Sequence, residues 1–159
     1  NYASGKTREN NKEKNGGFRK LKIKLTIPGK PLGKQRPRVM RNGHTYTPDK
    51  TVNYETLVKQ LYITEHFQKQ LPGAIKATIT AYMPIPKSES KVRKEKMREG
   101  KIRPTKKPDW DNIGKIITDA LNGLAYDDDK QIVDARVIKL YGDQPRVEVE
   151  LEEIEEVEV

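Results

Sequence analysis

Acidic residues gather at two places in the second half of the chain. Asp109 and Asp111 flank Trp110, and the triplet Asp127, Asp128 and Asp129 follows a short apolar segment. Pro108 favours extended backbone before it, and side chains two apart in extended chain point the same way. Asp109 and Asp111 would then face one hard cation such as Mg²⁺, which prefers oxygen ligands. The structural alternative is that one of the two simply caps the helix predicted to begin here.

Lys115 lies four residues after Asp111, so one helical turn places it on the same side as that carboxylate. One interpretation is an ordinary surface ion pair. The other is a cation that contacts a phosphate and stabilises charge developing on it. Asp119, another turn along, either orients Lys115 or is a plain helix-surface charge.

The triplet Asp127–Asp129 separates the helix from an apolar strand. Three adjacent acids repel one another, and a bound divalent cation would offset that repulsion; the alternative is a solvated Asp-rich turn. With Asp109, Asp111 and Lys115, these are the parts of a magnesium-dependent phosphodiesterase, in which water is the nucleophile. Mn²⁺ is a possible substitute for Mg²⁺. The chain has no cysteine, so disulfides and zinc-thiolate sites are excluded, and His44 and His66 lack metal-ligand spacing.

Four strands are predicted from alternating apolar and polar residues. Three of them have apolar rows: Leu21, Ile23, Leu25 and Ile27 in the first, Ile75, Ala77, Ile79, Ala81 and Met83 in the second, and Val147, Val149 and Leu151 in the last. The third strand is predicted to span about 134–140. The short connection 141–145 predicts that the last two strands form a hairpin. Alternation of this kind implies a sheet with one covered and one solvated face.

Two amphipathic helices are predicted to cover the sheet. The first spans about 48–70, with Tyr54, Leu57, Val58, Leu61 and Tyr62 as its apolar stripe, and the second begins near Asp111. The apolar stripe of the second consists of Ile113, Ile116, Ile117, Ala120, Leu121 and Leu124. The predicted fold is therefore α/β (α+β), a small mixed β-sheet with helices packed on one face.

Charge is distributed unevenly along the 159 residues, whose formal net charge is +9. Residues 1–50 hold 14 Lys and Arg against 3 Asp and Glu, and residues 87–107 hold 10 against 3. These two basic segments flank the acids and predict sequence-independent phosphate contacts. The predicted DNA-binding residues are Lys34, Arg36, Arg38, Arg41, Lys91, Arg93, Lys94, Lys106 and Lys107.

The predicted organisation is one domain with two tails. Residues 1–17 are expected to be a flexible arm or an expression remnant, 18–151 the domain with a basic excursion at 87–107, and 152–159 an acidic tail. No apolar run approaches membrane-spanning length and no nucleotide-binding motif is present, so we expect no membrane partner, no nucleotide cofactor and a cytoplasmic protein acting on nucleoid DNA.

The chain resembles the RusA family of Holliday-junction resolvases, which are bacterial and prophage endonucleases. The resemblance rests on the stretches 107–115, 119–123 and 127–133 and extends through Lys139. The N-terminal stretch 27–31 and the Lys-rich excursion fit prophage-type members. Trp110 and Gly114 depart from the usual pattern: the first suggests tolerated packing, the second close approach of DNA or of a packing partner.

The resemblance implies roles for individual residues. Its metal-binding acids fall on Asp109, Asp111 and Asp129, with Asp128 as the alternative to Asp129, and its essential lysine falls on Lys115. It further implies Mg²⁺ dependence, a homodimer, and paired nicks in opposing strands of a four-way junction. Junction resolution serves DNA recombination and repair.

Three alternatives remain open from the sequence. The first is a non-catalytic module that binds branched DNA, and the second is a metal-dependent nuclease on RNA or on fork or flap DNA. The third is a structural partner bound through the Glu-rich C-terminus. Binding of branched DNA without cleavage would favour the first, and competition between substrates would identify the second. Deletion of 152–159 without loss of activity would dismiss the third.

Overall fold

The computed structural model describes residues 20–156, so the predicted arm at 1–17 lies outside the described residues. Its central feature is a mixed sheet in the order β1-β6-β4-β5, which comprises β1 (Lys22–Pro28), β4 (Ile75–Pro84), β5 (Ile132–Gly142) and β6 (Arg146–Glu153). β6 runs antiparallel to both β1 and β4, whereas β4 and β5 are parallel. The predicted mixed sheet is confirmed.

The last two strands do not form the predicted hairpin. β4 lies between β5 and β6, so the connection through Asp143, Gln144 and Pro145 passes over the end of one strand. Neighbouring strands are about 4.8 Å apart, and a few extended residues are enough to cross that gap twice. A short connection therefore limits the separation of two strands without making them neighbours.

Alternation places the predicted apolar rows of β1, β4 and β6 on one buried face, except for Leu21, which precedes β1, is 41% exposed and was wrongly predicted to face inward. Ile23, Leu25 and Ile27 of β1 are at most 3% exposed, and Val147, Val149 and Leu151 of β6 match them. The opposite face is polar and open, with an ion pair between Lys22 and Glu150 at 2.6 Å. β6 continues to Glu153, so the first two residues of the predicted acidic tail are strand, and 157–159 lie outside the described residues.

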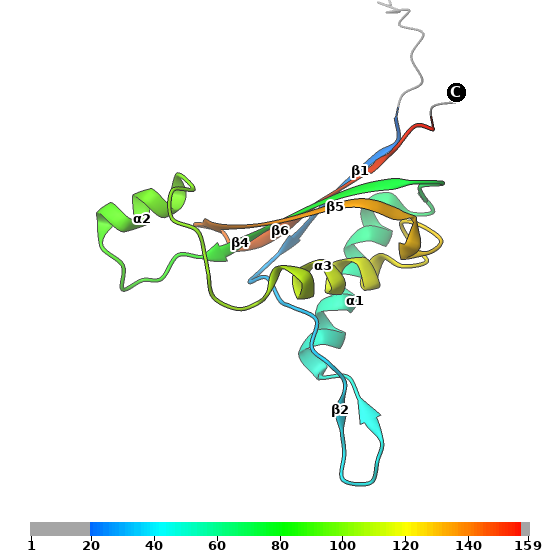
Figure 1. The fold of residues 1–159 in the computed structure, drawn as a ribbon, viewed down its shortest axis with the longest axis horizontal. Helices are drawn as coiled ribbons and strands as arrows, with labels where there is room; N and C mark the ends of the chain where they lie inside the picture. The colour runs from blue at the N-terminus through cyan, green and yellow to red at the C-terminus, as the bar shows by residue number, and fades with distance from the viewer. Residues whose placement is uncertain (1–19, 157–159) are drawn as a thin grey trace, which may run out of the picture.

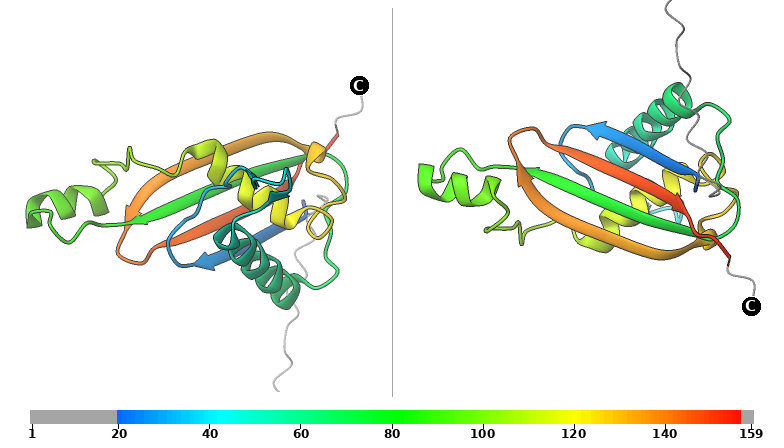
Figure 2. Two further views of the ribbon diagram at one scale, coloured as in Figure 1. Left: turned by 90° about the horizontal axis from the view of Figure 1, so that it is seen from below. Right: turned by 90° about the horizontal axis from the view of Figure 1, so that it is seen from above.

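Helices α1 (Asp49–His66) and α3 (Trp110–Leu121) cover the apolar face of the sheet (Figure 1). Val58 and Tyr62 of α1 are buried, and α3 buries Ile113, Ile116, Ile117, Ala120 and Leu121. The two views in Figure 2 show both helices on one side and the sheet open on the other. The predicted two-layer arrangement is thus confirmed, although α1 ends before the predicted residue 70.

Two basic elements project from this body (Figure 1). The strands β2 (Arg38–Val39) and β3 (Thr45–Tyr46) form a two-stranded hairpin on the helix side of the sheet. Helix α2 (Lys91–Arg98) lies beyond one end of the sheet, where Arg98 contacts both oxygens of Asp143 at 3.0 and 3.1 Å. Met97 of α2 is only 2% exposed, so its side chain anchors the helix to the rest of the fold. A short 3-10 helix, η1 (Asp129–Gln131), precedes β5.

Candidate active site

Asp109 is the N-cap residue of α3, but its side chain makes no capping hydrogen bond. The simple capping interpretation is therefore wrong for this carboxylate, which is left exposed. Asp109 has extended backbone, whereas Trp110 and Asp111 already belong to the first turn of the helix. Asp109 therefore lies just before the helix and Asp111 within its first turn. The prediction that both lie on one stretch of extended chain is wrong. Both are exposed at the positive end of the helix, where negative charge is stabilised.

The loop 30–35 packs directly against the start of α3. The backbone N–H of Lys34 donates to the carbonyl of Asn112 at 2.8 Å. A Cβ atom at Gly33 would lie 2.8 Å from the Cβ of Pro108 and 3.1 Å from that of Asn112. Only glycine permits this approach, so Gly33 fixes the distance between the loop and the acid-bearing segment. From the other side, the Lys139 ammonium donates to the carbonyl of Lys106 at 2.5 Å.

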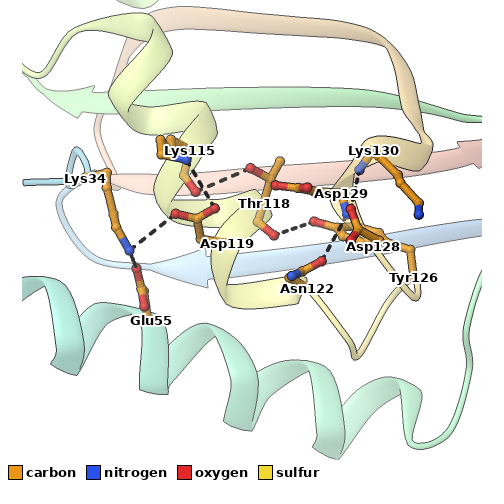
Figure 3. Close-up of polar contacts among 10 residues, drawn as sticks. All are labelled: Lys34, Glu55, Lys115, Thr118, Asp119, Asn122, Tyr126, Asp128, Asp129 and Lys130. Carbon is orange, nitrogen blue, oxygen red and sulfur yellow. Dashed lines mark hydrogen bonds and ion pairs between the residues drawn. The ribbon is translucent and has the colours of Figure 1, made fainter.

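Four charged side chains form an ion-pair network along α3 (Figure 3). Asp119 lies 3.6 Å from the ammonium of Lys115 and 3.3 Å from that of Lys34, and Lys34 also donates to Glu55 of α1. Burial opposes the charge on Lys34, but the hydrogen bonds and charges of Glu55 and Asp119 outweigh it and raise the pKa of Lys34. Asp119 therefore contacts two lysines, which favours the predicted role of orienting Lys115 over that of a plain helix-surface charge.

The triplet after α3 divides into residues with different contacts. The carboxylate of Asp128 accepts the backbone N–H of Lys130 at 2.9 Å, and the side chain of Gln131 accepts the N–H groups of Asp127 and Asp128. This is a capping box for η1. The bond from Lys130 outweighs the opposing effect of burial and, with smaller contributions from Asp129 and from the charge of Lys130, lowers the pKa of Asp128. Asp128 thus has a structural task, which favours Asp129 over Asp128 as a candidate ligand.

Asp129 is held near the C-terminal end of α3. Its backbone N–H donates to the side chain of Asn122, the C-cap residue, at 3.0 Å. The Tyr126 hydroxyl donates to the carbonyl of Thr118 at 2.5 Å, which ties the turn to the same end of the helix (Figure 3). Burial, together with the charges of Asp129 and Asp119, raises the pKa of Tyr126.

The predicted ligands therefore occupy the two ends of α3. Within residues 20–156, no three acidic or histidine side chains come close enough together to hold one metal ion. Asp109 and Asp111 nevertheless offer the exposed oxygen donors that Mg²⁺ uses, and Mg²⁺ is commonly held by one or two carboxylates together with substrate phosphate and water. The donor chemistry fits Mg²⁺, whereas a cage of three protein carboxylates is not formed.

A cleft of about 500 Å³ opens beside Asp109. It lies between the loop 30–35 and the start of α3, and its charged lining consists of Lys30, Lys34, Lys50, Lys107 and Asp109. Lys30 and Lys50 were not among the predicted DNA-binding residues. Both belong to the first of the two basic segments, but Lys50 lies at its very end, in the first turn of α1, and only the fold brings it beside Lys30.

Six of the nine predicted DNA-binding residues lie on or beside the two projecting elements. Arg36, Arg38 and Arg41 are exposed on or beside the β2–β3 hairpin. Lys91, Arg93 and Lys94 belong to α2, where Arg93 also contacts Glu89 at 2.7 Å. Lys106 and Lys107 are exposed just before the acids, whereas Lys34 is largely occupied by Glu55 and Asp119.

The two residues that depart from the family pattern have different surroundings. A Cβ atom at Gly114 would lie 3.2 Å from a methyl group of Val137 on β5, so a packing partner accounts for this glycine. Trp110 is 65% exposed, and the prediction that it is packed is wrong.

The chain is similar to known proteins over most of its length. Residues 28–152 match the family described as endodeoxyribonuclease RusA. A relative from Bacillus subtilis (strain 168), the uncharacterized protein YqaN, is 41% identical over 137 residues, which cover 83% of this chain and 96% of that relative. The fold and these matches define a nuclease of the mixed α+β class that acts on DNA. The chain belongs to the RusA endodeoxyribonuclease family. In the part of the chain that the structure describes, no helix has the length and apolarity to span a membrane.

Proposed function

We propose that this protein is a Mg²⁺-dependent, structure-selective endodeoxyribonuclease that resolves Holliday junctions by paired phosphodiester hydrolysis, in DNA recombination and repair. The observation that carries the proposal is the family match over residues 28–152, which includes every acid and lysine of the candidate site. The exposed pair Asp109 and Asp111, one turn from Lys115, supports it with chemistry.

Asp109 and Asp111 are proposed to hold Mg²⁺ together with a DNA phosphate. When bound, Mg²⁺ supplies a water of lowered pKa and neutralises charge on the phosphate. The ammonium of Lys115, whose side chain is 62% exposed, is free to approach the same phosphate and stabilise the charge that develops there. Asp129 enters the proposal through the family resemblance, since the structure does not bring it beside Asp109.

Lys34 and Asp119 are proposed to position Lys115 and not to contact DNA. Lys34 is anchored by Glu55 of α1, and Asp119 links it to Lys115 on α3. A lysine side chain has several rotatable bonds, so ordering it against a phosphate costs conformational entropy. An ion pair with the carboxylate of Asp119, one turn away, already restricts Lys115 and lowers that cost.

The basic elements around the cleft are proposed to hold DNA by its phosphates. These residues come from separate parts of the fold, as expected for recognition of shape. They are the hairpin residues Arg36, Arg38 and Arg41, the basic residues of α2, and the cleft lysines Lys30, Lys50 and Lys107. A homodimer completes the proposal, because a two-fold assembly presents two sites to the two equivalent strands of a junction.

Cleavage of a labelled four-way junction by the full chain and three variants tests this proposal. Asp109→Asn and Asp129→Asn are expected to lower the rate by at least about a hundredfold, the scale of losing one charge-stabilising group. Asp127→Asn is the matched control, because Asp127 is exposed in the same turn and uses only its backbone N–H. Undiminished cutting by both test variants would end the site assignment. Binding without cutting in any divalent metal would favour a binding module, and preference for RNA or flap DNA would change the substrate.

A further inference from the structure

Trp110 presents a large apolar surface at the start of α3. It is the first residue of that helix and 65% exposed. An exposed indole costs free energy in water, and tryptophan is enriched at binding interfaces relative to the rest of the surface. Neither the fold nor the ion-pair network requires this side chain to face solvent. Its apolar surface is therefore available to a ligand or a partner.

Trp110 lies among residues that are proposed to contact a DNA phosphate. Asp109 and Asp111 precede and follow it, Lys107 is exposed two residues before Asp109, and Lys115 is one turn beyond Asp111. Because Trp110 is adjacent in sequence to both acids, a DNA strand whose phosphate meets them would pass close to the indole. A second copy of the chain seated on Trp110 would instead cover the two acids that a substrate must reach.

Base stacking is the interaction that an indole offers to DNA without regard to sequence. In a continuous duplex both faces of every base are already stacked, so no face is free. At a branch point, stacking is interrupted and base faces become available. We propose that Trp110 stacks on a base exposed at the branch point, beside the phosphate to be cut, and so favours branched over linear DNA. This inference rests on the proposed function, because it needs DNA at Asp109 and Asp111.

The fluorescence of Trp110 tests the inference directly, because it is the only tryptophan in the chain. The full chain is titrated in Ca²⁺, another cation with oxygen ligands, in place of Mg²⁺. The DNA is a four-way junction or a linear duplex of the same sequence, and the anisotropy of a dye on the DNA reports binding. Emission is expected to fall as the junction saturates and to change little on the duplex. Saturation of the junction with unchanged emission overturns the inference.

Substitutions separate stacking from packing. Trp110→Phe is expected to keep most of the preference for junction over duplex, and Trp110→Leu to lose about tenfold of it, within the range measured for one stacked base. The thermal midpoint of Trp110→Leu should match that of the unsubstituted chain, because the side chain is exposed. A leucine variant that keeps the preference, or that unfolds at lower temperature, contradicts stacking.

Three further outcomes are distinguishable. Emission that shifts with protein concentration in the absence of DNA assigns Trp110 to a contact between copies and overturns the inference. Emission that falls on branched DNA which the protein never cuts, in Mg²⁺ or Mn²⁺, keeps the stacking contact and removes the proposed nuclease function. Cutting of junctions without any change in emission does the reverse.

Discussion

At the scale of single residues, Asp128 and Asp129 are neighbours with different tasks. Asp128 caps η1 through the N–H of Lys130, while the side chain of Asp129 is exposed. We predict that Asp128→Ala lowers the thermal midpoint because the first turn of η1 loses its acceptor. Asp128→Asn keeps an acceptor and should be milder. Asp129→Asn should leave the midpoint unchanged and remove cleavage; the reverse pattern would exchange the two assignments.

The stability contributed by Asp128 should also depend on pH. Its pKa is lower in the folded chain than in the unfolded chain, so the unfolded state binds the proton more readily. The contribution is therefore fully present at neutral pH and is lost as the pH falls through the lowered pKa. Urea unfolding of the full chain and of Asp128→Ala should show a difference at pH 7 that shrinks in acid. A difference that grows in acid would contradict the cap.

Lys115 and Asp119 should act as a unit. We predict that Asp119→Asn slows single-turnover cleavage about tenfold, and that the same change adds little once Lys115 is already alanine. Asp134→Asn, an exposed carboxylate on β5, is the matched control. Multiplicative effects of Asp119→Asn and Lys115→Ala would show that Asp119 does not act through Lys115.

At the scale of elements, the approach of the loop 30–35 to α3 depends on Gly33. We predict that Gly33→Ala destabilises the fold by about 1–3 kcal/mol, because its Cβ atom would overlap Pro108. Gly114→Ala is the matched comparison. Alanine has a helix propensity better than that of glycine by about 1 kcal/mol, and this gain offsets the close contact of the new Cβ atom with one methyl group of Val137. Urea unfolding measures both. Equal effects would mean that the loop is not held by this contact.

The β2–β3 hairpin should contribute affinity that depends on salt. Replacing Arg36, Arg38 and Arg41 with alanine is expected to weaken junction binding and to flatten the plot of log affinity against log salt by about 0.9 for each DNA phosphate that these arginines no longer neutralise. The triple alanine variant of Lys20, Lys24 and Lys76, exposed residues of the open side of the sheet, removes the same charge. If both variants bind alike, net charge and not the hairpin explains the affinity.

Much of the layered fold could be predicted from the sequence, because alternation and helical spacing are local patterns. The buried rows of β1, β4 and β6 and the stripe of α3 follow them residue by residue. Strand order could not be predicted, since β4 enters between β5 and β6 through pairings that no local pattern specifies.

The candidate site was predictable in its residue types but not in its contacts. Lys34 looked like a phosphate ligand within a basic loop, and only the fold brings Glu55 and Asp119 to it. The difference between Asp128 and Asp129 depends on a 3-10 turn too short to leave a periodic signal.

At the scale of the whole molecule, the proposal requires two active sites to act on one junction. One chain provides one set of Asp109, Asp111 and Lys115, so paired incision needs two copies. The strands β1 and β5 are both edges of the sheet, and the two projecting basic elements lie outside it. An edge strand has unpaired backbone N–H and C=O groups, so both edges offer a surface to a second copy.

The most direct measurement is cleavage of a supercoiled plasmid that extrudes a cruciform, in Mg²⁺ and in EDTA. Paired hydrolysis converts the plasmid straight to linear DNA, whereas independent nicks accumulate open circles first. We predict linear product in Mg²⁺, none in EDTA, and none from Asp109→Asn in either. Linear product in EDTA, or equal product from Asp109→Asn, would contradict a metal-dependent resolvase with its acids at the start of α3.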